Sequence, residues 1–367
     1  MPALAVDATT QRSLAPYGFD LAALEAFRAR LAGPAASNAV KGTLTPPAPE
    51  DVTPLPPLGS AARDRLRKAG QALIARGEVG VVVLAGGMAT RFGGVVKAVV
   101  PVLDGRSFLQ LKAEDIEKVS RAAGGQVKPL VMSSFSTHET IAAHVKEKGL
   151  FGGKLDLFPQ LVSLRLTPQG ELFLDTEGQP SPYATGHGDF SFALRQSGAL
   201  KRFRDAGGTL LVMSNVDNLG ATVDPAMLAL HRELGARLTA EVVRKEKGDK
   251  GGAPARLDGV PQIIEGFRFP PGFDQDSIPV FNTNTFVFEA AALDRDFELP
   301  FYRVEKTVDG RPAIQFERLV GELSAFLPTR FVEVLREGPD GRFLPAKDPE
   351  ELQRRLPSIA EVVRSAR

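Results

Sequence analysis

The most constraining feature of the chain is the segment Val79 to Val102, VGVVVLAGGMATRFGGVVKAVVPV, in which an apolar run leads directly into a glycine-rich turn. The continuous apolar run from Val81 to Leu84 is typical of a strand covered on both faces in a parallel sheet. Gly86 and Gly87 then allow a tight turn in which backbone amides can approach an anion. Taken alone, this segment is equally compatible with a nucleotide site and with an ordinary strand-to-helix connection.

Two cations follow these glycines, Arg91 and Lys97, and they could neutralise a polyphosphate that leaves water to bind at the turn. The glycine spacing excludes the two commonest nucleotide motifs. Glycines at positions 86, 87, 93 and 94 do not fit G-x-G-x-x-G, and no glycine precedes a Lys-Ser or Lys-Thr pair. The segment is therefore neither a standard dinucleotide fingerprint nor a P-loop.

Composition excludes several classes of protein. The chain has 367 residues and no cysteine, which rules out disulfides, zinc-thiolate sites and thiol nucleophiles. With 45 Lys and Arg against 44 Asp and Glu, the net charge of +1 gives no reason to expect a nucleic-acid partner. The sequence shows neither a signal-peptide pattern nor an apolar run long enough for a membrane span. We therefore expect a cytoplasmic protein that binds neither nucleic acid nor membrane.

The order of the expected elements predicts an α/β fold. Helical periodicity covers 21–31, a Pro-rich connector follows at 45–57, and a second helix is expected at 61–76. From there strands and helices alternate, which is the rhythm of right-handed βαβ units. The pattern predicts a mixed, mainly parallel central sheet flanked by helices. Its strands are expected at 81–84, 129–133, 155–158, 209–213, 238–244, 285–288 and 330–335.

An acidic residue, Asp217, follows the expected strand 209–213 within the polar segment SNVDN. In open α/β sheets ligands bind beyond the carboxyl ends of the strands, so this segment and the glycine turn should converge. Asp217 could hold Mg²⁺ through one carboxylate while phosphates and water complete the octahedron. The alternative is an Asx turn that leads into the next helix.

Three further segments carry side chains suited to binding. His187 lies between two glycines, where the backbone could bring the imidazole against a ligand, although a structural histidine is the alternative. Asn282 and Asn284 should share one face of a strand. Paired side-chain amides there could bind sugar hydroxyls, and a turn whose hydrogen bonds are made within the protein is the equal alternative. Lys347 emerges from a constrained loop, where a lysine is usually just solvated.

Together and in this order, these segments resemble the UTP–glucose-1-phosphate uridylyltransferase family (the UDP-glucose pyrophosphorylases), within the wider UDP-sugar pyrophosphorylase group. The similarity spans roughly Val79 to Leu352, and the collinear order makes a set of individually weak motifs specific. GHGD, DNLGA and NTN favour the glucose branch over the N-acetylglucosamine branch. The matched pieces are AGGMATRFGG with Lys97, PLVMSSFSTHET, the glutamine of LFPQ, GHGD, NVDNLGATVD, KGG, FNTNTF, QFE and RFLPAK.

The resemblance implies a Rossmann-like nucleotidyltransferase fold of the GT-A-like type and a role for each matched residue. The cations Arg91, Lys97 and Lys347 would neutralise phosphates in catalysis, and Asp217 would bind Mg²⁺. The implied nucleotide-binding residues are Leu84, Ala85, Gly86, Gly87, Gln160, Gly186 and Asn215. The implied residues for the sugar phosphate are His187, Asn218, Asn282, Asn284 and Glu317.

The implied reaction is a direct in-line attack of glucose-1-phosphate on the α-phosphorus of UTP, which gives UDP-glucose and pyrophosphate without a covalent enzyme intermediate. Positioning and charge cancellation would do most of the work. Residues 1–58 would then form a helical cap and Pro-rich connector, 59–328 the catalytic domain, and 329–367 a short C-terminal segment carrying a phosphate-facing lysine. The sequence after Lys347 leaves no room for the C-terminal β-helix of eukaryotic relatives, so we expect a monomer.

Three alternatives stay open. One is a UDP-sugar pyrophosphorylase for other sugar phosphates, such as those of galactose or N-acetylglucosamine. Another is a non-catalytic nucleotide-sugar-binding protein, because Ala89 replaces the family's usual glycine, Val95 and Val96 replace its Gly-Pro, and the loop to Lys97 is one residue shorter. A nicotinamide oxidoreductase would share the doubly wound rhythm, but the chain lacks the fingerprint glycines.

Overall fold

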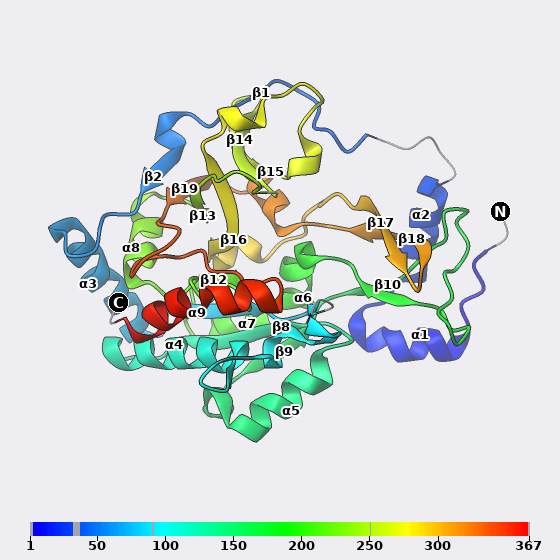
Figure 1. Cartoon of the computed structure of the whole chain (residues 1–367), viewed down its shortest axis with the longest axis horizontal. Helices are drawn as coiled ribbons and strands as arrows, with labels where there is room; N and C mark the ends of the chain where they lie inside the picture. The colour runs from blue at the N-terminus through cyan, green and yellow to red at the C-terminus, as the bar shows by residue number, and fades with distance from the viewer. Residues whose placement is uncertain (1–2, 32–36, 90–91, 250, 366–367) are drawn as a thin grey trace.

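The computed structural model describes residues 3–31, 37–89, 92–249 and 251–365. At its centre lies an eight-stranded sheet in which β16 runs antiparallel to both neighbours and the other pairs are parallel (Figure 1). The predicted mixed, mainly parallel sheet is therefore confirmed. In spatial order the strands are β2 (Val52–Pro54), β19 (Thr329–Glu333), β13 (Leu238–Arg244), β16 (Val280–Glu289), β12 (Leu210–Asn215), β3 (Val79–Leu84), β8 (Lys128–Ser133) and β9 (Asp156–Pro159).

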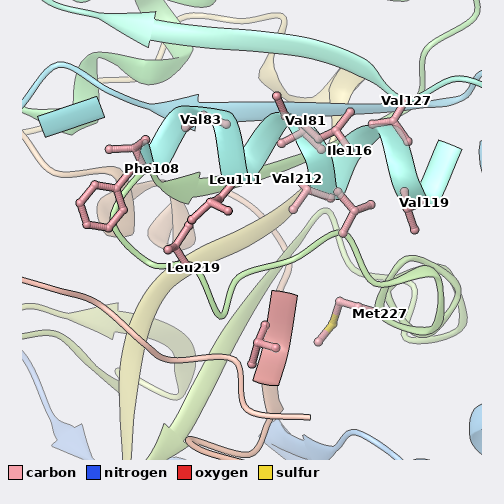
Figure 2. Packing of buried hydrophobic residues seen from close by; sticks show 14 of the residues in the cluster. Val81, Val83, Phe108, Leu111, Ile116, Val119, Val127, Val212, Leu219 and Met227 are labelled. Atoms are coloured by element: carbon pink, nitrogen blue, oxygen red, sulfur yellow. The ribbon is translucent and has the colours of Figure 1, made fainter. Parts of the chain in front are cut away.

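The central strand β3 shows how the sheet is covered on both faces. All of its residues are buried, and successive side chains point to opposite faces of a strand. Val81 and Val83 belong to one apolar core, whereas Val82 and Leu84 belong to another. Figure 2 shows the first core, where Val81 and Val83 lie near Ile116 of a flanking helix. The apolar run of the sequence thus encodes a strand with two buried faces.

Helices cover the two faces unequally. The second core contains residues of two short helices, α6 (Phe190–Gln196) and α7 (Ala199–Asp205). In the first core, α4 begins at a capping box between Ser107 and Gln110 and ends at Gly124, whose φ of 66° closes the helix in the left-handed region. The helices that contribute to the first core are α3 (Ala61–Ala75), α4 (Phe108–Ala123), α5 (His138–Lys148), α8 (Pro225–Glu233) and α9 (Pro349–Arg364).

Smaller elements surround the sheet. The N-terminal helices α1 (Ala8–Leu14) and α2 (Leu21–Leu31) share a third apolar core with strands β10 and β18 (Figure 1). Across the described ranges, no helix is both long enough and apolar enough to cross a membrane. The smaller strand pairings are β1 (Leu44–Thr45) with β14 (Ala253–Leu257) and β15 (Val260–Ile264), β10 (Val162–Leu164) with β11 (Pro182–Ala184), β17 (Tyr302–Val308) with β18 (Arg311–Glu317), β4 (Met88–Ala89) with β5 (Val95–Val96), and β6 (Pro101–Leu103) with β7 (Arg106–Ser107).

Two strands of the main sheet come from segments expected outside the catalytic domain. β2 lies within the Pro-rich connector, and its position at the sheet edge tolerates a proline such as Pro54. β19 follows position 328 and pairs in parallel with both β13 and β2. The segments before residue 59 and after residue 328 therefore each supply a strand to the same sheet as residues 59–328.

The packing of α3 on α8 yields a stability prediction. A methyl group at Gly70 would lie 1.7 Å from the carbonyl oxygen of Pro225, so the helix backbones touch at this point. Gly70→Ala should lower the free energy of unfolding by about 1–3 kcal/mol through overpacking, although alanine has the higher helix propensity by about 1 kcal/mol. Urea denaturation measures the change, with Lys68→Ala on the exposed side of α3 as the control. A Gly70→Ala protein as stable as the wild type would contradict the close contact.

Candidate active site

The candidate site lies beyond the carboxyl ends of β3, β9 and β12. β3 and β12 pair in parallel, with Leu84 opposite Asn215, and the amide of Val216 donates to the carbonyl of Leu84 at 3.0 Å. The glycine turn and the polar segment around Asp217 therefore leave the sheet side by side. This is the convergence that the sequence predicted.

The glycine turn is fixed by hydrogen bonds on two sides. The amide of Ala85 donates to Met132 at 2.7 Å, and the carbonyl of Gly86 accepts from the hydroxyl of Ser134 at 2.8 Å. A methyl group at Gly86 would lie 2.6 Å from Oε1 of Gln160, so the turn and this side chain are in close contact. Two of the expected nucleotide residues, Gly86 and Gln160, thus lie in contact at the strand ends.

The far end of the turn leads to Lys97. The amide of Lys97 approaches the carbonyl of Gly87 at 3.3 Å, across the short β4–β5 hairpin. This contact returns the chain to the sheet edge, so that Lys97 lies near the strand ends despite the intervening loop. The other expected cation, Arg91, lies outside the described residues.

The GHGD segment packs its backbone against the chain that follows β18. Gly186 has a φ of 96°, and a methyl group on it would lie 2.5 Å from the carbonyl oxygen of Arg318. A methyl group on Gly188 would meet the same residue at 2.5 Å, and the Gly188 amide donates to it at 2.8 Å. Both glycines are needed for this contact, which brings His187 and Glu317 to the same region.

His187 is held in a defined tautomer. Its Nδ1 accepts the backbone N–H of Val320 at 3.0 Å, and burial lowers the pKa of the imidazole to about 4. A neutral imidazole that accepts at Nδ1 must carry its proton on Nε2. Half-buried His187 therefore presents an N–H donor, without a positive charge, on the side away from Val320.

Asp189 links the GHGD segment to other parts of the chain through its buried carboxylate. Its carboxylate makes a buried ion pair with Arg318 at 2.6 Å and accepts from Thr185 at 2.6 Å and from the Leu161 amide at 3.1 Å. The side chain makes no hydrogen bond that caps α6. These contacts tie the GHGD segment to Leu161, the residue after Gln160.

Lys97 and Asp217 meet in the middle of the site. Nζ of Lys97 lies 2.5 Å from Oδ2 of Asp217, and each side chain retains 16% exposure. Asp217 thus projects from its turn toward the glycine segment, instead of closing a local Asx turn. The pair places a cation and a hard oxygen ligand side by side, at a point that solvent can still reach.

The structure shows which contacts Asn218 makes within the protein. This residue is 1% exposed, and its amide donates to the carbonyl of Arg342 at 3.1 Å while its oxygen accepts from Leu344 at 2.9 Å. Both polar atoms make hydrogen bonds within the protein, so Asn218 joins the turn to the loop, and its contact with the sugar phosphate stays a prediction. An isolated bridge to Pro345 brings the exposed Lys347 close to the Asp217 turn.

A bulge in β16 alters the expected geometry of the two asparagines. Val242 of β13 is opposite Asn282 and Ala240 is opposite Phe286, so three residues of β16 face one residue of β13. Asn284 has a φ of 59°, and its amide donates to Asn215 Oδ1 at 3.1 Å. The prediction that Asn282 and Asn284 alternate onto one strand face is wrong, because the bulge turns Asn284 toward the end of β12.

Two carboxyl groups flank the site. Glu317 lies against Gly186, where a methyl group would approach its Cβ at 3.3 Å, and burial raises the pKa of its carboxyl. Glu265 was missed from the sequence. Its carboxylate lies where methyl groups on Gly252 and Gly321 would each approach it at 3.2 Å, and it lines a cavity of about 520 Å³. Burial and the nearby charge of Glu322 raise the pKa of Glu265 to about 7.

The matched KGG motif ends at Gly252, which packs against Glu265, but the motif gave no signal for that residue. Its Lys250 lies outside the described residues. No sequence spacing connects Glu265 with that motif, since the two are joined by the β14–β15 hairpin. The contact is therefore visible in the structure and not in the local pattern.

The donor set of the site fits a metal bound largely through a ligand. Within the described ranges, no cluster of three or more Asp, Glu or His side chains could hold an ion by itself. Asp217 offers one carboxylate beside Lys97. Mg²⁺ is commonly held by one or two carboxylates together with substrate phosphates and water, so a single carboxylate suffices in that arrangement.

Comparison with known proteins agrees with this geometry. The family model for UTP–glucose-1-phosphate uridylyltransferase matches residues 27–356. UTP–glucose-1-phosphate uridylyltransferase 2 of Dictyostelium discoideum is 28% identical over 294 residues, which cover 75% of this chain and 57% of that protein. The chain spans about three fifths of the length of the curated relatives that it matches first.

Solved structures share the fold at lower identity. A UDP-glucose phosphorylase from Trypanosoma brucei aligns with a TM-score of 0.72 and 23% identity over 93% of this chain and 76% of its own. A UDP-N-acetylglucosamine pyrophosphorylase from the same organism aligns with a TM-score of 0.73 and 19% identity over 85% and 72% of the two chains. The expected nucleotidyltransferase fold is confirmed. The family match extends across most of the chain, and the fold gathers its motifs at one sheet edge: this protein belongs to the UTP–glucose-1-phosphate uridylyltransferase family.

Proposed function

We propose that this protein transfers the uridylyl group of UTP to glucose-1-phosphate and releases pyrophosphate. The observation that carries the proposal is the meeting of Lys97 and Asp217, 2.5 Å apart, beside the glycine turn. Phosphoryl-type transfer needs positioned charge more than covalent chemistry. A phosphate-binding cation and a hard oxygen ligand at the strand ends supply that charge. The family membership supports the same reaction.

The uridine would bind along the surface from Gly86 to Gly186. Gly86 and Gly186 are packed closely by Gln160 and Arg318, and the side-chain amide of Gln160 offers a base both a donor and an acceptor. Ser134 holds the Gly86 carbonyl, so the surface is rigid before the nucleotide arrives. Asn215 would contact the nucleotide from the neighbouring strand end, with its orientation fixed by Asn284.

The sugar phosphate would bind on the side formed by His187, Glu317 and the bulge of β16. The Nε2–H of His187 can donate to a phosphate oxygen, and Glu317 and Glu265 can accept from sugar hydroxyls. Asn282 would lie at the edge of this site. Its backbone N–H donates to the carbonyl of Gly252 at 2.9 Å, which fixes its position. In this arrangement the hexose lies between the GHGD segment and the β14–β15 hairpin.

In the proposed reaction an oxygen of glucose-1-phosphate forms a bond to the α-phosphorus of UTP while the bond from that phosphorus to the bridging β-oxygen breaks. Lys97 and Lys347 would neutralise charge on the phosphates and the leaving pyrophosphate. Asp217 would hold Mg²⁺, which when bound supplies positive charge to the phosphate oxygens. The residues of the site would hold the two substrates in line, and this positioning would accelerate the direct transfer without a covalent intermediate.

A second sugar specificity is favoured by one observation. The UDP-N-acetylglucosamine pyrophosphorylase and the UDP-glucose phosphorylase of Trypanosoma brucei have nearly equal TM-scores to this chain, 0.73 and 0.72. The backbone fold therefore does not distinguish the two hexoses. The alternative is that this protein uses another sugar-1-phosphate, with the same mechanism and a different set of contacts around Glu265.

The direct test is pyrophosphate release with Mg²⁺ and UTP, comparing the 1-phosphates of glucose, galactose and N-acetylglucosamine. We expect a preference for glucose-1-phosphate.

Lys97→Ala should lower kcat by about 100-fold or more, because it removes a cation aimed at phosphate charge. Lys41→Ala, an exposed lysine of the N-terminal segment, serves as the control. Near-normal turnover of Lys97→Ala would contradict the role of Lys97, and UTP binding without pyrophosphate release would instead support a non-catalytic nucleotide-binding protein.

His187 gives a prediction on pH dependence. With its pKa lowered to about 4, the imidazole should stay neutral from pH 5.5 to 8.5. The ratio of kcat/KM between the wild type and His187→Gln should therefore be constant across that range. An inflection of this ratio near pH 6.5 would show that His187 titrates as an ordinary, solvated histidine and would contradict the buried neutral tautomer.

Asp217 gives a prediction on the metal. Asp217→Asn should raise the Mg²⁺ concentration needed for half-maximal rate by several-fold, since an amide is a weaker ligand than a carboxylate for a hard cation. A Mg²⁺ titration of the pyrophosphate-release rate measures the shift, and EDTA should abolish activity in both proteins. Superimposable titrations for Asp217→Asn and the wild type would return Asp217 to a structural turn.

A further inference from the structure

We propose that Arg342 is a positioning residue that sets the Asp217 turn and the Lys347 loop against each other, so that metal ligand and phosphate-binding lysine are held as one unit. Arg342 is 1% exposed and is among the largest fully buried side chains of the protein. It lies five residues before Lys347 in the chain, outside the set of residues that would touch substrate. This inference rests on the proposed function, because it assigns Arg342 an indirect part in the same reaction.

The guanidinium of Arg342 binds two elements at once. It pairs with both carboxylate oxygens of Glu241 on β13, with Nε 2.8 Å and Nη2 2.5 Å away. The same Nη2 donates to the backbone carbonyl of Thr222 at 3.0 Å, within the turn that follows Asp217. A fork of donors in fixed geometry is a property of arginine that lysine lacks. The side chain therefore fastens the Asp217 turn to the sheet.

The backbone around Arg342 binds the same turn from the other side. Asn218, directly after Asp217, uses both polar atoms of its amide on Arg342 and Leu344. A methyl group on Gly220 would lie 2.6 Å from the carbonyl carbon of Arg342, so the two backbones are in contact. The turn and the loop thus have no room to move separately. A shift at Arg342 displaces Asn218 and the segment that ends in Lys347 together.

Buried charges around the pair are matched. Asp224 Oδ2 lies 3.7 Å from Nη1 of Arg342 and also pairs with Arg63 at 2.7 Å, and Arg63 pairs in turn with Asp340 at 3.1 Å. Buried charges are stable when each has a partner, whereas removal of one partner leaves the other uncompensated. The network therefore favours one arrangement of the turn and the loop over alternatives.

A second basic side chain, Lys112, also holds the turn, through contacts that do not include Arg342. Buried Lys112 on α4 donates to Ala221 at 2.7 Å and to the hydroxyl of Ser214 at 3.2 Å, and Asp115 accepts from the Val223 amide at 2.8 Å. α4 therefore still anchors the turn when Arg342 is changed. Loss of the Arg342 fork should loosen the turn and the Lys347 loop together from β13 while the fold remains.

The test is Arg342→Lys, which keeps the charge and loses the fork. We expect kcat to fall by about 10- to 100-fold, since a displacement of about 1 Å can cost 100-fold, and the Mg²⁺ concentration for half-maximal rate to rise several-fold. KM for glucose-1-phosphate should change less than about two-fold, because the hexose contacts lie elsewhere in the proposed site. The matched control is Arg256→Lys, since Arg256 makes a bidentate pair with Asp51 at 2.7 and 2.9 Å away from the site and should leave the kinetics unchanged.

A double-mutant cycle distinguishes positioning from general loss of structure. If Arg342 acts through Lys347, then Arg342→Lys should cost several-fold less in kcat when it is made in a Lys347→Ala protein. Purely structural damage would lower kcat by the same factor in both backgrounds and would overturn the proposal. Equal kinetics of Arg342→Lys and the wild type would also overturn it. Should Arg342→Lys fail to fold by circular dichroism, Glu241→Gln provides the same cycle from the partner side.

Hydrogen exchange separates this inference from the proposed function. Arg342→Lys should raise amide exchange in 216–224 and in 343–347 together, whether or not the protein is a uridylyltransferase. If the wild-type protein released no pyrophosphate, the proposed function would be refuted. The coupled exchange of the two segments would still test whether Arg342 positions them. Faster exchange in one segment with unchanged exchange in the other would refute the coupling, even in an active enzyme.

Discussion

The parallel pairing of β3 with β12 is the constraint on which the rest of the site depends. Leu84 lies opposite Asn215, and both strands are buried on their two faces. A slip of one residue would exchange the faces of every side chain, so the two cores fix this register. The loops that leave the two strands consequently begin at the same level. Lys97 and Asp217 can meet because of this alignment, although 120 positions separate them in the chain.

Three ion pairs carry much of the charge around the site. Asp217 has Lys97, Asp189 has Arg318, and Glu241 has Arg342. Under the proposed function, Lys97 would pair with a polyphosphate, and Asp217 would hold a divalent cation in place of Lys97. Binding would then exchange ion pairs instead of creating unpaired charge in a region of low dielectric. The partial exposure of this pair, in contrast to the fully buried Arg342, permits that exchange.

The sequence was sufficient for the parts of the fold that depend on local pattern. The apolar run Val81 to Leu84 predicted a doubly buried strand, and the expected strand 238–244 coincides with β13. Glycines such as Gly86 were predictable as points of close approach, although the neighbour that required them was not. Asn218 and Asn284 were assigned from resemblance and alternation, and both make contacts that the sequence did not reveal. The side chain of Asn218 donates to the carbonyl of Arg342, 124 residues away, and Asn284 lies in a bulge of β16 and donates to Asn215. Glu265 and Arg342 depend on tertiary packing in the same way.

The position of the C-terminal loop follows from these long-range contacts. β19 extends the sheet beside β13, and the chain then turns back so that Arg342 reaches Glu241 of β13 from the opposite side of the Asp217 turn. The loop is thereby built into the sheet, although its sequence suggested an appended segment with a solvated lysine. β2 pairs with β19 at the sheet edge, so the N-terminal connector supports the same arrangement. The candidate site draws on loops that follow strands across the sheet, from β19 near one side to β9 at the other. These loops can hold fixed relative positions only if the strands share one hydrogen-bonded layer, and here they do.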